Sequence, residues 1–180
     1  QKIFGNQLDK LNDKKRKQIQ DEFKKELRPT FADFFAGAGG LSCGFTQAGF
    51  RVCFANDFED VCVRTYRYNH PEVPVDKVVK DDIRKIVDNV QNYIDEDVDV
   101  VVGGPPCQGF SSANQQRIID DPRNELYKYY IECVKKILPK FVVMENVRGM
   151  LKVADQVVED YESIKEKKNG VTYSYAVSYK

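Results

Sequence analysis

The chain of 180 residues has the length of one ordinary domain, and its 42% hydrophobic and 12% aromatic residues exclude a disordered protein. Basic and acidic side chains number 28 each, so the formal net charge is zero, which excludes a histone-like basic protein but allows a locally basic face. Five scattered cysteines without a C-x-x-C pair argue against a disulfide framework or zinc module and favour a reducing compartment. No apolar run approaches ~18 residues, so we expect no membrane span.

Residues 1–28 form a charged first segment. They carry nine Lys or Arg against five Asp or Glu, a local net charge of +4 that leaves −4 for the rest. The stretch from Leu8 to Leu27 has few helix breakers, and its apolar residues recur at helical spacing. We therefore expect one long, mostly solvated helix here, followed by a second unit over residues 29–180.

Strands and helices alternate from residue 30 onward. The predicted elements, in chain order, are a buried strand Thr30–Phe35, a glycine-rich turn Ala36–Gly40, a helix Leu41–Ala48, a strand Phe50–Ala55, a helix Phe58–Asn69, a strand Val75–Val79, a helix Ile83–Tyr93, a strand Val98–Val102, a loop Gly103–Asp120, a helix capped by Asp121, a strand Phe141–Met144, a helix Val153–Lys168 and a strand Thr172–Tyr179. This alternation predicts an α/β fold with a doubly wound, mostly parallel sheet. Ligands of such sheets bind outside the carboxyl ends of the strands.

The first candidate binding site is the glycine-rich turn after the first strand. Glycines at 37, 39 and 40 remove Cβ atoms, so a ligand can lie against the backbone at a helix start. A dinucleotide fingerprint needs a glycine at position 42, where Ser42 stands, so the turn fits a nucleotide-like ligand but not the NAD pattern. A plain tight turn is the alternative.

Acidic residues follow the next two predicted strands. Asp57 lies 20 residues beyond Gly37, where a carboxylate can accept both hydroxyls of a ribose, and the neighbouring Phe58 offers a ring to a purine. Asp82 and Ile83 offer a polar and an apolar contact to the same base. Either aspartate could equally be an ordinary helix N-cap.

Two further sites offer groups for catalysis. Cys107 lies in a Gly/Pro loop, where a thiolate nucleophile is a better interpretation than a buried structural cysteine. Glu145 and Asn146 emerge from an apolar strand at the expected ligand edge, so Glu145 is a candidate acid or hydrogen-bond anchor. A salt bridge to the nearby Arg148 is the alternative for Glu145.

Together these residues resemble the DNA (cytosine-5) methyltransferase family. The family's motifs match Asp33 to Gly40 with Gly44-Phe45, Asn56-Asp57, Asp82-Ile83, Gly104 to Ser111, Asp121 to Leu126, and Glu145-Asn146-Val147. The resemblance covers about residues 30–150, and its Pro-Pro-Cys-Gln-Gly-Phe-Ser and Glu-Asn-Val strings are highly specific. It implies a Rossmann-like fold, S-adenosylmethionine as cofactor and double-stranded DNA as partner, without a metal or a membrane. The expected location is the cytoplasm of a bacterium or the nucleus of a eukaryote.

The resemblance also implies a role for each matching residue. Cys107 would attack C6 of a flipped-out cytosine, Glu145 would stabilise or protonate N3, and Asn146 and Arg123 would support the catalytic loop. The implied cofactor contacts are Phe35, Ala36, Gly37, Gly39, Gly40, Leu41, Asp57, Phe58, Asp82, Ile83, Gly104, Pro106 and Leu126.

The chain departs from the family pattern in several places. Family members usually carry glutamate where Asp57 stands, and the later Gln-x-Arg-x-Arg segment and the target-recognition domain have no match here. We therefore expect a catalytic half, and the alternative is a subunit or fragment that binds cofactor but methylates only with a partner that reads DNA. The Gly5-Asn6 segment resembles the family's closing cofactor segment, so a circular permutation would bring Asn6 to the cofactor.

Two other enzyme classes compete with this interpretation. A zinc-dependent base deaminase is suggested by His70-Pro71-Glu72 and by Pro106-Cys107, but Phe110 occupies the position of its second cysteine. We therefore expect no zinc, and His70 is better explained as a helix-ending residue beside Pro71. A nicotinamide-dependent oxidoreductase is disfavoured by Ser42.

Overall fold

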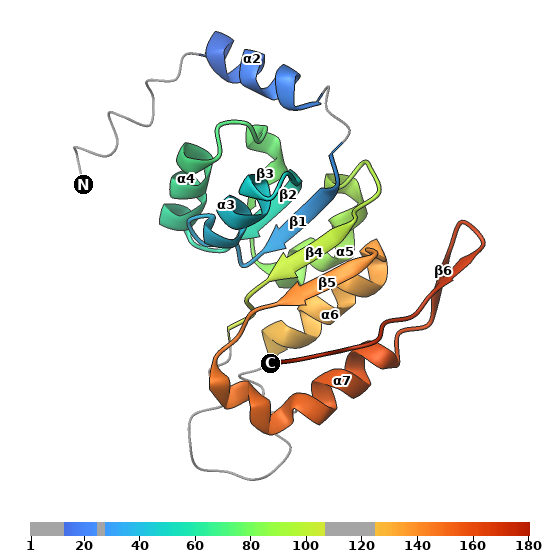
Figure 1. Cartoon of the computed structure of the whole chain (residues 1–180). Helices are drawn as coiled ribbons and strands as arrows, with labels where there is room; N and C mark the ends of the chain where they lie inside the picture. The colour runs from blue at the N-terminus through green and yellow to red at the C-terminus, as the bar shows by residue number, and fades with distance from the viewer. Residues whose placement is uncertain (1–12, 25–27, 107–124) are drawn as a thin grey trace.

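Five parallel strands form the central sheet, in the order β3-β2-β1-β4-β5 (Figure 1). The computed structural model describes residues 13–24, 28–106 and 125–180. Its elements are α2 Asp13–Lys24, β1 Thr30–Phe34, α3 Gly40–Gln47, β2 Arg51–Asp57, α4 Asp60–Asn69, η1 Val75–Lys77, β3 Val78–Lys80, α5 Ile83–Tyr93, β4 Val100–Gly103, α6 Glu125–Ile137, β5 Phe141–Met144, η4 Arg148–Val153, α7 Ala154–Glu162, β6 Glu166–Lys168 and β7 Val171–Tyr173. The predicted α/β fold with a mostly parallel sheet is confirmed.

Helices cover both faces of the sheet because β1 is apolar on both sides. Phe31 packs in a cluster with residues of α4 and partly buried residues of α3, whereas Ala32 and Phe34 pack in a second cluster with residues of α5 and α6. Successive side chains of a strand point to opposite faces, so one buried strand supplies both layers.

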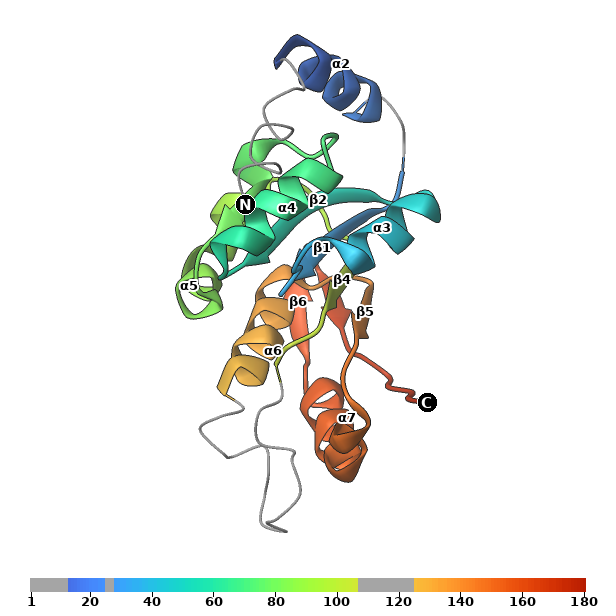
Figure 2. The same ribbon diagram turned by 90° about the vertical axis from the view of Figure 1, so that its left-hand side faces the viewer.

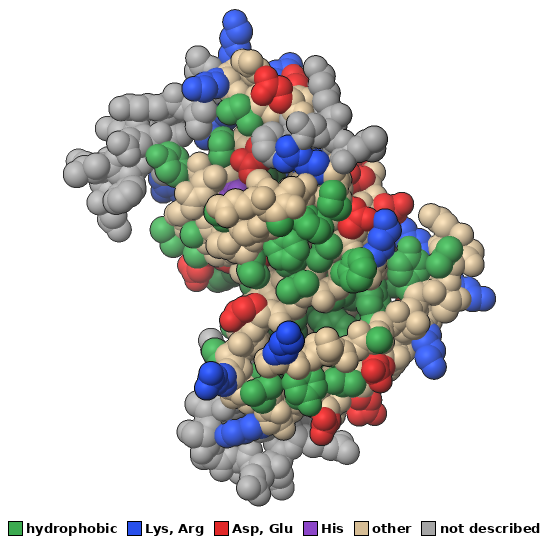
Figure 3. Space-filling view, in the orientation of Figure 1, with side chains coloured by type: hydrophobic (Ala, Val, Ile, Leu, Met, Phe, Trp, Pro, Cys, Tyr) green, Lys and Arg blue, Asp and Glu red, His purple; other side chains and the backbone are tan. Residues whose placement is uncertain are grey.

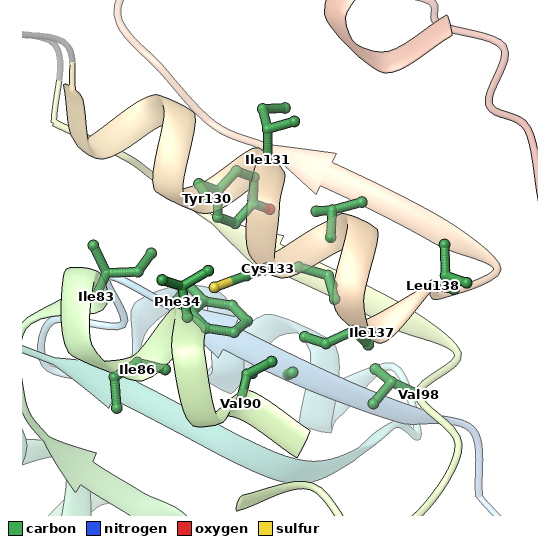
Figure 4. Close-up of a cluster of buried hydrophobic side chains, with 14 of the residues drawn as sticks. Phe34, Ile83, Ile86, Val90, Val98, Tyr130, Ile131, Cys133, Ile137 and Leu138 are labelled. Atoms are coloured by element: carbon green, nitrogen blue, oxygen red, sulfur yellow. The ribbon is translucent and has the colours of Figure 1, made fainter. Parts of the chain in front are cut away.

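The contact between α5 and α6 forms the larger of these two clusters (Figure 4). Ile83, Ile86 and Val90 recur along one side of α5, as the helical period predicts, and meet Tyr130 and Ile137 of α6 above the sheet.

The carboxyl-terminal part of the chain differs from the prediction. The expected helix Val153–Lys168 is present only over α7, Ala154–Glu162, and its later part is wrong because β6 and β7 then form an antiparallel hairpin. Asn169 and Gly170 have φ values of 52° and 79°, the left-handed pair that a two-residue hairpin turn requires. The expected strand Thr172–Tyr179 is present only to Tyr173 and pairs with β6, not with the parallel sheet.

The amino-terminal helix α2 forms within the charged segment, in agreement with its spacing. Figures 1 and 2 place α2 at one end of the molecule and α7 at the other. The Gln20 side chain donates to the carbonyl oxygen of Pro71 at 3.5 Å, which brings α2 next to the turn after α4. The division of the chain at residue 28 stays a prediction.

One strip of the sheet is left open at the edge strand β5. Phe141 and Val143 are paired in register with Val100 and Val102, which are buried, yet they are 68% and 42% exposed. The layer of α3 and α4 therefore does not extend over β5, and Figure 3 shows hydrophobic side chains gathered between that layer and α7. Over the residues described, no helix is both long enough and apolar enough to span a bilayer.

Candidate active site

The glycine turn between β1 and α3 is held in an unusual backbone conformation. Phe35, Gly37 and Gly39 all have positive φ values, of 56°, 55° and 90°. A positive φ is unusual for phenylalanine and marks strain of a kind that clusters at functional sites. The Ala36 amide donates to the carbonyl of Asn56 at 3.0 Å, which ties the turn to β2. The turn therefore lies at the carboxyl edge of the sheet, where the sequence predicts a ligand.

Asp57 reaches this turn from the end of β2. Its Oδ2 accepts a hydrogen bond from the Gly37 amide at 2.8 Å, and its Oδ1 accepts one from the Glu59 amide at 2.9 Å. The N-cap of α4 is Glu59, so the alternative that Asp57 caps this helix is wrong. The neighbouring Phe58 is 64% exposed. A carboxylate and an uncovered aromatic ring thus flank the glycine turn.

The next predicted pair, Asp82 and Ile83, has structural roles at the start of α5. Asp82 is the N-cap of α5 and accepts a hydrogen bond from the Arg84 amide at 2.9 Å, as the cap alternative predicts. The Arg84 guanidinium beside it lowers the pKa of Asp82. The Ile83 side chain is only 3% exposed and packs in the core. A cofactor contact at this pair stays a prediction.

The turn after β5 is bonded to the segment after β4. The Glu145 amide donates to the Gly103 carbonyl at 3.0 Å, and the Asn146 side-chain amide donates to the Pro105 carbonyl at 2.9 Å. A Cβ added to Gly104 would lie 3.2 Å from Oε2 of Glu145, so the carboxylate lies directly over that glycine. The structure shows no ion pair between the described residues Glu145 and Arg148. Glu145 is therefore placed where the cysteine loop begins.

Some predicted site residues lie outside the described part of the chain. These are Cys107, Arg123 and Asn6. Of the described ones, Pro106 follows the bonded Pro105 and is half-buried, and Leu126 is half-buried in the first turn of α6. Gly103 has no room for a side chain, because a Cβ there would lie 2.8 Å from the Phe34 carbonyl oxygen.

Sequence reasoning missed a buried polar cluster beneath the glycine turn. The Ser42 hydroxyl donates to Oδ2 of Asp33 at 2.6 Å and lies 2.6 Å from the Tyr66 hydroxyl. Burial raises the pKa of Asp33 to about 7, although the hydrogen bond from Ser42 lowers it. The available signal was an aspartate inside an otherwise apolar strand, because a buried carboxyl needs a partner.

The arrangement of His70 argues against the zinc deaminase. Its Nδ1 lies 3.0 Å from Glu72 and its Nε2 lies 3.1 Å from the Gly39 carbonyl oxygen, so both ring nitrogens are engaged within the protein. Among the residues described, no group of three His, Cys, Asp or Glu side chains could hold a metal ion. His70 does end α4, as its C-cap.

Two cavities lie away from the glycine turn. One, of about 900 Å³, is lined by residues 94–97, 135–138 and 166–168, and it contains none of the predicted site residues. The other, of about 600 Å³, lies along β5, α7 and residues 174–180 and includes Asn146. Of these two cavities, only the second therefore touches the candidate site, through Asn146.

Comparison with known proteins shows the family to which the chain is similar. The family model for C-5 cytosine-specific DNA methylase matches residues 29–180. The Type II methyltransferase M.AgeI of Thalassovita gelatinovora is 44% identical over 128 residues, which are 70% of this chain and 29% of the relative. The Type II methyltransferase M.AquIA of Picosynechococcus sp. is 39% identical over 153 residues, 81% of this chain and 60% of the relative.

A solved structure shows the same fold. It is a candidate DNA modification methyltransferase encoded within a prophage of E. coli, with a TM-score of 0.60 and 31% identity, and the match covers 74% of this chain and 36% of that one. This chain thus spans less than two thirds of the length of each of these three proteins. The match to the family model covers most of the sequence, and the chain belongs to the C-5 cytosine-specific DNA methylase family.

Proposed function

We propose that this chain transfers a methyl group from S-adenosylmethionine to C5 of cytosine in DNA, through a covalent bond between Cys107 and C6 of a flipped-out base. The observation that supports this most strongly is the order of the strands β2-β1-β4-β5. It brings Asp57, the glycine turn, the start of the cysteine loop and Glu145 to one edge of the sheet, in that order. The residues proposed to bind a cofactor therefore lie on the same sheet edge as Glu145, which is proposed to bind a base.

The described residues fit the cofactor. Each oxygen of the Asp57 carboxylate accepts one backbone hydrogen bond, and its remaining lone pairs can accept the two ribose hydroxyls. A Cβ at Gly37 would meet nothing within 4 Å, so the backbone there is open to a ligand. The exposed ring of Phe58 can stack on adenine. When bound, S-adenosylmethionine supplies an electrophilic methyl group.

The protein's own residues prepare the cytosine. The Cys107 thiolate adds to C6, and Glu145 stabilises or protonates N3, so that C5 becomes nucleophilic. After C5 has taken the methyl group it loses its proton, and the Cys107 sulfur is eliminated from C6. The hydrogen bond from Asn146 to Pro105 holds the beginning of the cysteine loop beside Glu145.

The nucleophile is tested with DNA that carries 5-fluorocytosine. Fluorine cannot leave C5 as a proton does, so the wild type should form a stable covalent adduct in the presence of S-adenosylmethionine. Cys107→Ser should form none while it still binds the cofactor. Cys43→Ser changes an exposed cysteine of α3 and should behave as the wild type. An adduct of normal yield with Cys107→Ser would disprove the assignment.

The cofactor site is tested separately by calorimetry. Asp57→Ala should weaken binding of S-adenosylmethionine at least about tenfold, because two charge-assisted hydrogen bonds to ribose are lost. Asp155→Ala, at an exposed position of α7, is the matched control. An unchanged dissociation constant in Asp57→Ala would remove its ribose role.

The alternative to methyl transfer by this chain alone is that methylation needs a further polypeptide that reads DNA. It is supported by the exposed Phe141 and Val143 on β5, and by the share of the curated relatives that this chain leaves uncovered. That polypeptide would cover the open strip and the adjoining cavity of about 600 Å³. The assay combines labelled S-adenosylmethionine and DNA with this chain, with and without a candidate partner. Methyl transfer by the chain alone would contradict the dependence.

A further inference from the structure

Two successive residues at the end of α4 hold two successive carbonyls of the glycine turn. The Asn69 side-chain amide donates to the Ala38 carbonyl oxygen at 2.8 Å, and Nε2 of His70 donates to the Gly39 carbonyl oxygen at 3.1 Å. The fit is close, because a Cβ on Gly39 would lie 2.4 Å from Nε2 of His70. The end of α4 therefore helps to hold the turn, together with the Cys43 amide of α3, which donates to the same Gly39 carbonyl oxygen at 2.8 Å.

The partners of His70 require a charged ring. Nε2 faces the Gly39 carbonyl and Nδ1 faces the Glu72 carboxylate at 3.0 Å, and both partners are hydrogen-bond acceptors. A neutral imidazole has only one N–H, so both bonds form only when the ring is doubly protonated. Burial lowers the pKa of His70, but the bonds to Glu72 and to the Gly39 carbonyl outweigh this and raise it above its usual value.

The other groups around His70 are neutral or acidic. The ring of Tyr66 lies on it with centroids 4.5 Å apart, and Asp33 of β1 raises its pKa from across the cluster. Ser42 of α3 joins Tyr66 to Asp33. His70 itself is 4% exposed. A cation at this position is therefore stabilised by Glu72, by the Gly39 carbonyl and by Asp33.

The hydrogen bonds from Asn69 and His70, which together we call the clamp, also affect the direction of the first amide of α3. In a trans peptide the carbonyl and the following N–H point in opposite directions. When His70 holds the Gly39 carbonyl, the Gly40 N–H is directed away from α4. This amide belongs to the first turn of α3, whose N–H groups have no partner within the helix and suit a polar ligand.

We propose that Asn69 and the imidazolium form of His70 are positioning residues for the cofactor, and that deprotonation of His70 loosens the glycine turn and weakens cofactor binding. This inference rests on the proposed cofactor site at that turn. It assigns to the end of α4 a role in affinity that acts through the glycine turn.

The experiment measures binding of S-adenosylhomocysteine, the stable product, by calorimetry between pH 6 and pH 9. Wild-type affinity should fall at least about fivefold as pH rises through the His70 titration. His70→Gln keeps a neutral donor for the Gly39 carbonyl and should bind with a pH-independent affinity, whereas His70→Ala should bind at least about tenfold more weakly throughout. Asn69→Ala should also bind more weakly, and Asn92→Ala, at an exposed position of α5, should not.

The pKa of Asp33 is also about 7, so its effect on the pH dependence of binding must be distinguished from that of His70. Asp33→Asn should keep the decrease in affinity with pH. If Asp33→Asn abolishes that dependence and His70→Gln retains it, the inference is wrong.

The pKa of His70 in the wild-type chain, measured by NMR, tests the inference without any variant that could misfold. The sequence contains one histidine, so its ring signals in NMR need no assignment. If the imidazolium favours the bound turn, then S-adenosylhomocysteine must raise the pKa of His70 by linkage. An unchanged pKa, or pH-independent binding by the wild type, would overturn the inference alone. Absence of binding at every pH would overturn the proposed function and this inference with it.

Discussion

The side-chain amide of Asn146 donates a 2.9 Å hydrogen bond to the main-chain carbonyl of Pro105, two positions before Cys107 in the sequence. The bond joins the segments that follow two adjacent parallel strands, β4 and β5. On the same asparagine, Oδ1 accepts from the Val147 amide at 2.8 Å. One side chain thus links the turn that carries Glu145 to the beginning of the cysteine loop.

Replacement of this asparagine should affect stability slightly and adduct formation strongly. Asn146→Ala removes the bond to Pro105, so we expect a loss of about 1 kcal/mol in the free energy of unfolding in urea. The adduct with 5-fluorocytosine DNA should form at least about tenfold more slowly, with cofactor affinity unchanged. Asn89→Ala, at an exposed position of α5, is the control. Adduct formation at the wild-type rate would show that this bond does not position the loop.

Alanine at Gly39 should be much more costly than alanine at Gly37. Both glycines have positive φ values, so both substitutions strain the backbone by roughly 1–2 kcal/mol. At Gly37 the added Cβ meets nothing within 4 Å, whereas at Gly39 it would lie 2.4 Å from the His70 ring. Urea unfolding of the two variants isolates the effect of this clash. Equal stability of the two would mean that His70 moves away without cost.

The buried carboxyl of Asp33 should make stability depend on pH. Burial raises its pKa from 3.8 to about 7, so the folded protein holds this proton more tightly than the unfolded chain. Its contribution to stability is therefore complete below about pH 4 and is lost as pH rises through about 7. Asp33→Asn has nearly the same shape without the charge. We expect it to be more stable than the wild type by roughly 2–4 kcal/mol at pH 8, with little difference at pH 4.

Urea unfolding of both proteins at pH 4, 6 and 8 checks this prediction. Asp88→Asn, at an exposed position of α5, should follow the wild type at each pH. A constant difference between Asp33→Asn and the wild type would show that Asp33 is ionised throughout this range in the folded protein.

Replacement of two phenylalanines of the sheet by alanine should reduce the free energy of unfolding by very different amounts. Phe54 of β2 is fully buried, so Phe54→Ala should cost roughly 3–5 kcal/mol in the free energy of unfolding. Phe141 of β5 is mostly exposed, so Phe141→Ala should cost about 0.5 kcal/mol or less in the isolated chain. Thermal unfolding checks both variants. A large loss from Phe141→Ala would mean that this ring is buried in the isolated chain.

The alternation of apolar runs predicted most of the parallel core correctly. Four of the five strands and the helices between them lie close to their expected bounds, because each strand needs apolar residues on both faces and each helix needs one apolar stripe. The expected strand Val75–Val79 was wrong over its first three residues, which form the 3-10 helix η1, so that β3 begins at Val78. The prediction failed after Glu162, where the second part of the expected helix Val153–Lys168 is replaced by a hairpin whose first arm is β6, Glu166–Lys168. There the positive φ values of Asn169 and Gly170 decided the structure.

For the candidate site, too, some features followed from the sequence and others only from the tertiary structure. The sequence alone determined that the glycine turn, Asp57 and Glu145 lie at one edge of the sheet, because each follows a parallel strand and the carboxyl ends of these strands must meet. Only the tertiary structure revealed that Asn69 and His70 clamp the glycine turn and that Asn146 holds Pro105. Such contacts join residues about 30 to 40 positions apart, and they depend on how elements pack, which the local pattern of apolar and polar residues does not specify.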